Sequence, residues 1–302
     1  MPSNGIPKVP DVPPEVVDRI NEEKLCFFLG AGVSKLIGCK GWKEIAANLV
    51  EKCFKLKCIT YRQKESITRI NDPKKIITIC HNILLQEGFK DDFFEEVKES
   101  LQPEPGLQSS HNLYGELSGI PAIYITTNID THFDFAFKDR IVYKENDFNP
   151  KNVFRGKLYK IHGTIEDEDS IVFTVPQYLN RYRKQDFIGF LNQIFNSYSI
   201  VFLGYGLEEF EILDFLVTKI GEETKELKHW ILLPYYQGEG YMLNYDKGYF
   251  SSLGISVIGF EKDYDGYGQL YNVIKKWKKE ITELSDILHE DVKEMEETVD
   301  KL

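Results

Sequence analysis

The chain has 302 residues, an apolar share of 42% and a formal net charge of −11. This length and apolar content suit one large folded domain and exclude general disorder. The negative charge disfavours direct nucleic-acid binding, which needs a basic surface. No apolar run reaches the roughly 20 residues that cross a bilayer, and the start of the chain lacks a hydrophobic targeting segment. We therefore expect a cytoplasmic protein without membrane contact.

All five cysteines lie within the first 80 residues, and no two of them have the two-residue gap of a zinc knuckle. Without a secretory signal, such cysteines are expected to be reduced thiols. The sequence therefore predicts no metal site and no disulfide framework.

Residues 1–14 hold five prolines and are expected to form an extended lead-in. A buried strand at 25–29 follows, and Gly30 to Gly32 turn the chain into a helix. From about 53 to 118 the apolar residues recur with helical spacing and no strand is evident. Asp72 before Pro73 is typical of a helix start within this stretch. It therefore predicts an α-helical module inserted between the first two strands.

The sheet then resumes with short apolar runs that alternate with helical segments. Strands are expected at 122–126, 157–161, 171–175, 200–203, 230–233 and 255–260, and helices at 185–198 and 207–220. This alternation predicts an α/β fold with a Rossmann-like, doubly wound, mainly parallel sheet that spans 15–266 together with the helical insertion.

Residues 267–302 form a predicted amphipathic helix. Its apolar residues alternate four- and three-residue steps, with one slip, as in a coiled coil: Leu270, Ile274, Trp277, Ile281, Leu284, Leu288, Val292, Met295, Val299 and Leu302. The helix either packs on its own domain or docks against another subunit. The pattern does not choose between the two.

Four segments share one feature: each begins as a predicted strand and ends in small or polar residues. They read FFLGAGVS at 27–34, ITTNID at 125–130, KIHG at 160–163 and VFLGYG at 201–206. Open α/β sheets bind ligands at the carboxyl ends of their strands, so we expect a nucleotide site there. The glycine turn departs from the dehydrogenase fingerprint, because Lys35 stands where a third glycine is expected. Hydride transfer is therefore disfavoured.

Taken in this order, the four motifs resemble the sirtuin superfamily of NAD-consuming proteins. Trp42 after the glycine turn and GYGLEEFEI at 204–212 are similar to the divergent prokaryotic branch found in antiviral defence, as in Thoeris and sirtuin–HerA systems. Two features of the protein-deacylating sirtuins are missing from this sequence. It has no four-cysteine zinc ribbon after the His-Gly motif, and KLIGCKGW replaces the Pro-x-Phe-Arg element.

The resemblance implies roles for the matched positions. His162 would be the general base, and Asn128 would position the nicotinamide ribose and the attacking water. Asp130 would bind the nicotinamide carboxamide. The remaining binding residues would be Gly30, Ala31, Gly32, Ser34, Thr127, Gly204 and Gly206. Histidine suits the role of base because its ordinary pKa lies near neutrality.

Simpler interpretations of the same residues remain open. His162 would then bond a backbone carbonyl at a strand end. Asn128 and Asp130 would cap a helix over 133–137, which is a common use of these residue types.

The resemblance implies an NAD glycohydrolase that releases nicotinamide and ADP-ribose without a metal, as a regulated antiphage effector. NAD is then a substrate. We expect a homo-oligomer, and a further defence protein such as an ATPase is an expected partner. Two alternatives remain. One is a protein deacylase or ADP-ribosyltransferase, and the other is a non-catalytic module that binds NAD or ADP-ribose.

Overall fold

The computed structural model describes residues 5–104, 106–107, 112–206, 212, 215–216 and 228–299, with side chains as far as 284. A seven-stranded sheet forms the centre, and all of its strand pairs are parallel. The strand order is β3-β4-β2-β1-β5-β6-β7. The strands are β1 (Leu25–Leu29), β2 (Ile123–Thr126), β3 (Ile141–Val142), β4 (Leu158–Lys160), β5 (Ser199–Leu203), β6 (His229–Tyr235) and β7 (Ile255–Glu261).

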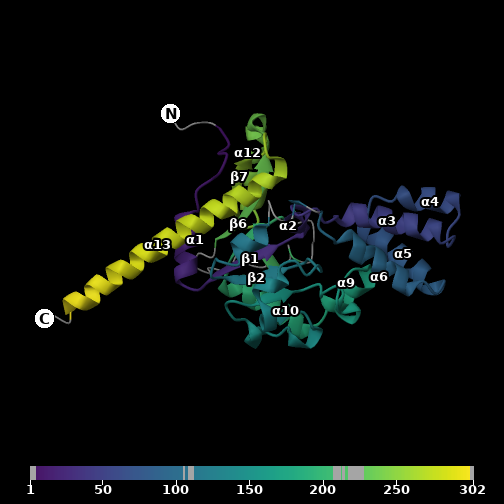
Figure 1. Ribbon diagram of the computed structural model, residues 1–302, viewed down its shortest axis with the longest axis horizontal. Helices are drawn as coiled ribbons and strands as arrows, with labels where there is room; N and C mark the ends of the chain where they lie inside the picture. Colours follow the sequence, from purple (N-terminus) through teal and green to yellow (C-terminus); the bar gives the residue numbers. More distant parts are fainter. Residues whose placement is uncertain are drawn as a thin grey trace.

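Helices surround this sheet (Figure 1). They are α1 (Pro14–Asn21), α2 (Ala31–Lys35), α3 (Trp42–Lys55), α4 (Tyr61–Thr68), α5 (Pro73–Gln86), α6 (Lys90–Ser100), α8 (Leu113–Leu117), α9 (Val175–Arg181), α10 (Gln185–Ser197), α12 (Gly240–Ser251) and α13 (Gln269–Val299).

Successive side chains of β1 enter opposite layers of the core, as strand geometry requires. Phe27 packs in the layer that α1, α8 and α13 cover, whereas Phe28 packs in the layer that α10 and α12 cover. A parallel sheet with both faces covered confirms the Rossmann-like, doubly wound fold. Strand β1 pairs with β2 on one side and with β5 on the other. The order of the strands changes direction at β1, and open α/β sheets bind ligands at the carboxyl ends of the strands at such a point.

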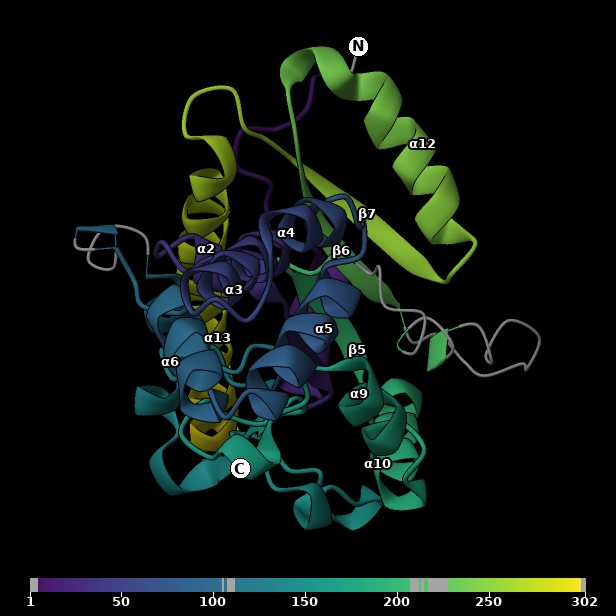
Figure 2. The same ribbon diagram turned by 90° about the vertical axis from the view of Figure 1, so that its right-hand side faces the viewer.

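Helices α3 to α6 form their own apolar cluster, which sits over one end of the sheet (Figures 1 and 2). Asp72 caps α5, because its carboxylate accepts hydrogen bonds from the amides of Lys74 and Lys75, as the sequence predicts. Ile129 and Phe173, which lie beyond the ends of β2 and β4, belong to the same cluster. These helices therefore close over the carboxyl edge of the sheet.

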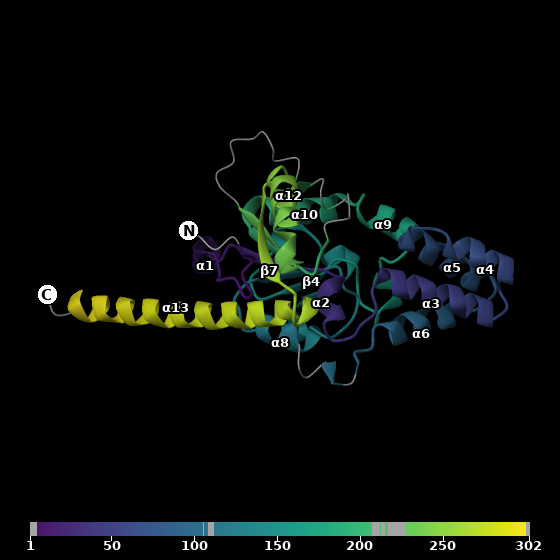
Figure 3. The same ribbon diagram turned by 90° about the horizontal axis from the view of Figure 1, so that it is seen from above.

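The extended lead-in and α13 hold each other against the sheet. The indole of Trp277 is fully buried and donates to the Pro10 carbonyl at 3.1 Å, and Glu280 accepts from the Val12 amide at 3.0 Å. The first half of α13 therefore packs on its own domain. Its far end projects beyond the body, opposite α3 to α6 (Figures 1 and 3). The seam positions beyond Leu284 lie outside the described side chains, so docking to another subunit stays a prediction.

One expectation about the sheet is wrong, and one strand was missed. Residues 171–175 form no strand, because Thr174 and Gln177 make a capping box that starts α9 with Pro176 in its first turn. The two-residue strand β3 at the sheet edge was not expected. The predicted helix at 207–220 lies almost entirely outside the described residues.

Candidate active site

The four motifs end at the same height along the sheet. Leu29 pairs with Thr126 of β2 and with Leu203 of β5, and Thr126 pairs with Lys160 of β4. Asn128 and His162 therefore both lie two residues beyond a registered pair on neighbouring strands. Parallel strands bring these segments to a single edge, which is the arrangement expected from the sequence.

The glycine turn packs tightly on the loop after β5. The Gly30 amide donates to the Leu203 carbonyl at 2.9 Å, and the Gly32 amide donates to the Gly204 carbonyl at 2.8 Å. A Cβ atom on Gly30 would lie 2.5 Å from the Gly204 oxygen, and Gly204 itself has a φ of 61°. Close backbone approach therefore requires glycine at these positions.

A small cavity lies between this turn, the end of β2 and the helical cluster. Its free volume is about 40 Å³, which is room for a few water molecules. The polar part of the lining is Ser34, Lys40, Thr127, Asn128 and Asp130, and the remainder is Ala31, Gly41, Trp42, Ile45, Leu101, Ile129 and Phe173. The cavity thus combines a polar side from the strand ends with an apolar side from the helices.

Asn128 has a fixed orientation within this lining. Its Nδ2 atom lies 2.9 Å from the Gly30 carbonyl oxygen and 2.9 Å from Ser34 Oγ. A carbonyl oxygen only accepts, so the amide nitrogen must face Gly30. Among the hydrogen bonds of the described residues, none is accepted by Asn128 Oδ1, which leaves this oxygen as an acceptor for a ligand.

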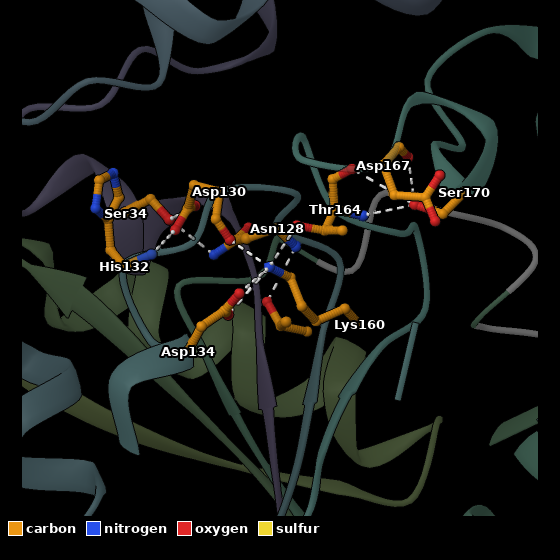
Figure 4. A network of polar contacts seen from close by, with 10 residues as sticks. Ser34, Asn128, Asp130, His132, Asp134, Lys160, Thr164, Asp167 and Ser170 are labelled. Atoms are coloured by element: carbon orange, nitrogen blue, oxygen red, sulfur yellow. Dashed lines mark hydrogen bonds and ion pairs between the residues drawn. The ribbon is translucent and has the colours of Figure 1, made fainter. Parts of the chain in front are cut away.

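Asp130 completes the polar side of the cavity (Figure 4). Its Oδ2 accepts from Ser34 Oγ at 2.6 Å, and its Oδ1 accepts from the His132 amide at 3.1 Å. The hydrogen bond to His132 is local, as in the capping interpretation. However, the short helix at Asp134–Ala136 has no side-chain cap. Asp130 therefore joins the loop after β2 to α2.

Tyr114 was not expected from the sequence. Its hydroxyl lies 2.9 Å from Ser34 Oγ and 3.2 Å from Asn128 Nδ2. Burial, with a smaller contribution from the Asp130 carboxylate, raises the pKa of the phenol well above its usual value. No motif marks this residue, because its contacts to Ser34 and Asn128 arise only from tertiary packing of α8.

Lys160 is a buried cation beneath the loop that carries Asp130 (Figure 4). Its Nζ donates to the Asp130 carbonyl at 2.7 Å, to Thr164 Oγ1 at 3.2 Å and to both carboxylate oxygens of Asp134 at 3.0 Å. Burial raises the pKa of Asp134, and the Lys160 ammonium opposes that rise. This network fixes the loops that follow β2 and β4 relative to each other.

His162 lies outside the cavity lining. Only 1% of its surface is exposed. Its Nε2 lies 3.0 Å from the Tyr182 hydroxyl, and its Nδ1 lies 3.3 Å from that of Tyr178. The backbone carbonyl of His162 also accepts from the Val172 amide at 2.9 Å, which brings Tyr178 of α9 and the following Tyr182 over the imidazole.

The structure thus divides the expected site residues into groups. Ala31, Ser34, Thr127, Asn128 and Asp130 line one cavity. Gly30, Gly32 and Gly204 form the packed turn beside it, and Gly206 is exposed beyond β5. His162 shares the sheet edge but is covered by Tyr178 and Tyr182.

None of the described helices is both long and apolar enough to cross a membrane. Within the same residues, no group of three or more histidine, cysteine, aspartate or glutamate side chains is arranged to hold a metal ion.

Comparison with known proteins adds two findings. Residues 122–258 match the family described as "SIR2-like domain". The chain is also similar to Defense-associated sirtuin 2 of Bacillus subtilis, at 26% identity over 210 residues. That alignment covers 66% of this chain but only 19% of the relative, so the chain spans a small part of the relative's length. The family match runs from β2 into β7 and includes Asn128 and His162.

Proposed function

We propose that this chain is a divergent sirtuin-like protein and an NAD glycohydrolase that releases nicotinamide and ADP-ribose. The observation that carries the proposal is the orientation of Asn128. Its amide nitrogen is held by Gly30 and Ser34, which leaves its oxygen as an acceptor beside Asp130 in the cavity. The similarity to a defence-associated sirtuin supports antiphage defence as the setting.

The chemistry needs few groups. Water attacks the anomeric carbon of the nicotinamide ribose while the glycosidic bond to nitrogen breaks, and nicotinamide departs with that electron pair as a neutral molecule. The attacking water loses one proton. Asn128 Oδ1 would accept a hydrogen bond from this water or from a ribose hydroxyl, Asp130 would bind the carboxamide, and His162 would take the proton. A positioned general base accelerates such steps by about 100- to 10,000-fold.

The residue types that line the cavity suit NAD, but the volume of the described cavity is too small for this substrate. A site for a ligand of drug size typically has at least about 300 Å³, and this cavity has about 40 Å³. We propose that the apolar wall moves away from the strand ends when NAD binds and that Tyr178 and Tyr182 then uncover His162. We propose that the structure is an inactive state and that assembly at high protein concentration releases it. An NADase without such control would deplete its own host.

The test is nicotinamide release from NAD by wild type, Asn128→Ala and His162→Ala over a range of protein concentrations. We expect release by wild type that rises steeply with concentration, and a loss of at least about 100-fold in both variants. His81→Ala, at a half-buried histidine of α5 outside the cavity lining, is the matched control and should keep full activity. Release that survives in both site variants would reject the assignment.

The small cavity and the covered imidazole also favour one alternative, a non-catalytic module that binds NAD or ADP-ribose. Such a module would be stabilised thermally by NAD without forming nicotinamide at any protein concentration or in complex with its partner. Only the glycohydrolase forms nicotinamide, so the same assay distinguishes the two proposals.

A further inference from the structure

Tyr114 is a buried phenol whose hydroxyl contacts two residues of the cavity lining. Only 2% of its surface is exposed, and its ring stacks on Phe133 with centroids 4.7 Å apart. The hydroxyl is 2.9 Å from Ser34 Oγ and 3.2 Å from Asn128 Nδ2. The rigid ring therefore brings one polar atom to the point where these two side chains meet.

The direction of each hydrogen bond follows from counting hydrogens. The Ser34 hydroxyl has one hydrogen and gives it to Asp130 Oδ2 at 2.6 Å, so the phenol must donate to Ser34. The phenol oxygen then accepts from Asn128 Nδ2. The bonds thus run in one direction from amide to phenol to hydroxyl to carboxylate, and each bond polarises the next.

This chain of bonds determines where the Asn128 oxygen points. One hydrogen of Nδ2 goes to the Gly30 carbonyl, and the other is shared between Ser34 and Tyr114. We propose that Tyr114 is a positioning residue that holds the carboxamide of Asn128 and the hydroxyl of Ser34 in the orientation that NAD cleavage requires. This inference rests on the proposed function of the same cavity.

A five-residue helix holds Tyr114 because α13 supports it from outside. Glu116 of α8 accepts from the Tyr271 hydroxyl at 3.1 Å and pairs with Lys278 at 3.1 Å. Leu113 and Leu117 are buried in the same layer as Trp277. The position of the phenol is therefore set by the packing of α13 on α8.

The test is Tyr114→Phe, which removes the hydroxyl and keeps the ring. We expect kcat for nicotinamide release to fall about 10-fold, with a smaller change in KM, because a misoriented carboxamide mainly weakens transition-state contacts. Tyr159→Phe is the matched control. Tyr159 is equally buried, but its hydroxyl bonds the backbone of Phe154 and Asn152, away from the cavity, so kcat should not change. Wild-type kcat in Tyr114→Phe would overturn the proposal.

A second readout does not depend on turnover. The side-chain amide resonances of Asn128 can be assigned as the pair that disappears in Asn128→Ala. They should shift in Tyr114→Phe and stay in place in Tyr159→Phe. Unshifted resonances in Tyr114→Phe would reject the positioning role. Absence of nicotinamide release by wild type would instead reject the proposed function, so the two failures can be told apart.

Discussion

The indole of Trp42 stacks on the ring of Phe173, with centroids 4.6 Å apart and planes inclined at 25°, and both rings line the cavity. Trp42 begins α3, whereas Phe173 follows the loop beyond β4. This contact therefore joins the helical cluster to the sheet edge and limits the volume of the cavity.

Trp42→Ala should enlarge the cavity and ease ligand entry. We expect the free energy of unfolding to fall by about 2–3 kcal/mol from lost burial and stacking. In the same variant, ADP-ribose should bind faster than in wild type, as measured by stopped-flow fluorescence. Phe54→Ala lies on the same helix away from the cavity and serves as the control for destabilisation. If ADP-ribose associated more slowly with Trp42→Ala than with Phe54→Ala, this result would contradict the role assigned to Trp42 in limiting the cavity.

Asn128→Asp tests the orientation of the carboxamide without changing its size. The variant replaces Nδ2 by an oxygen that faces the Gly30 carbonyl, so two acceptors meet and a buried charge is added next to Asp130. We expect a loss of about 2–4 kcal/mol in the free energy of unfolding. Asn149→Asp should be nearly neutral, because either side chain accepts from the Lys151 amide. Equal urea midpoints for the two variants would count against the orientation.

The buried pair of Lys160 and Asp134 gives a pH-dependent prediction. Lys160→Met should cost about 3–5 kcal/mol at neutral pH, because it leaves a largely buried carboxylate without its ion-pair partner. Burial already raises the pKa of Asp134 in the folded state, and loss of the ammonium raises it further. An acid whose folded pKa is raised destabilises the fold above that pKa, and the penalty fades as the pH falls through it.

The stability difference between Lys160→Met and wild type should therefore shrink from about pH 7 to about pH 4. Urea titrations at several pH values measure this difference. Addition of Asp134→Asn should recover part of the stability at neutral pH. A penalty that is constant with pH would show that Asp134 is not the group responsible.

Two residues of α13 separate packing from association. Trp277 is fully buried, so Trp277→Ala should lower the free energy of unfolding by about 3–5 kcal/mol. Leu284 is 41% exposed, and Leu284→Ala should change the free energy of unfolding by less than about 1 kcal/mol. If the seam also joins subunits, Leu284→Ala lowers the molar mass measured by light scattering. A mass equal to that of wild type would argue against docking through this part of the helix.

Much of the fold followed from local patterns in the sequence. Apolar runs such as 25–29 are buried on both faces, so they identify parallel strands without information from the rest of the chain. The segment 171–175 is also mostly apolar but forms no strand, because Thr174 and Pro176 begin a helix there. Composition does not distinguish these cases, whereas capping residues do.

The site was predictable only in part. Asn128 and Asp130 follow a recognisable strand, and parallel register places them beside the glycine turn. Tyr114 could not be predicted, because its contact with Asn128 depends on how α13 holds α8. The cover over His162 could not be predicted either, because Tyr178 and Tyr182 belong to α9 and its C-cap, where the sequence predicted a strand at 171–175 and no helix.

The most direct test of the account is the release of nicotinamide from NAD, followed by proton NMR, with purified wild type and Asn128→Ala at high protein concentration. We predict that wild type forms nicotinamide and ADP-ribose in equal amounts and that Asn128→Ala forms neither. Intact NAD with wild type, in the presence of binding, would contradict the claim that this cavity cleaves it.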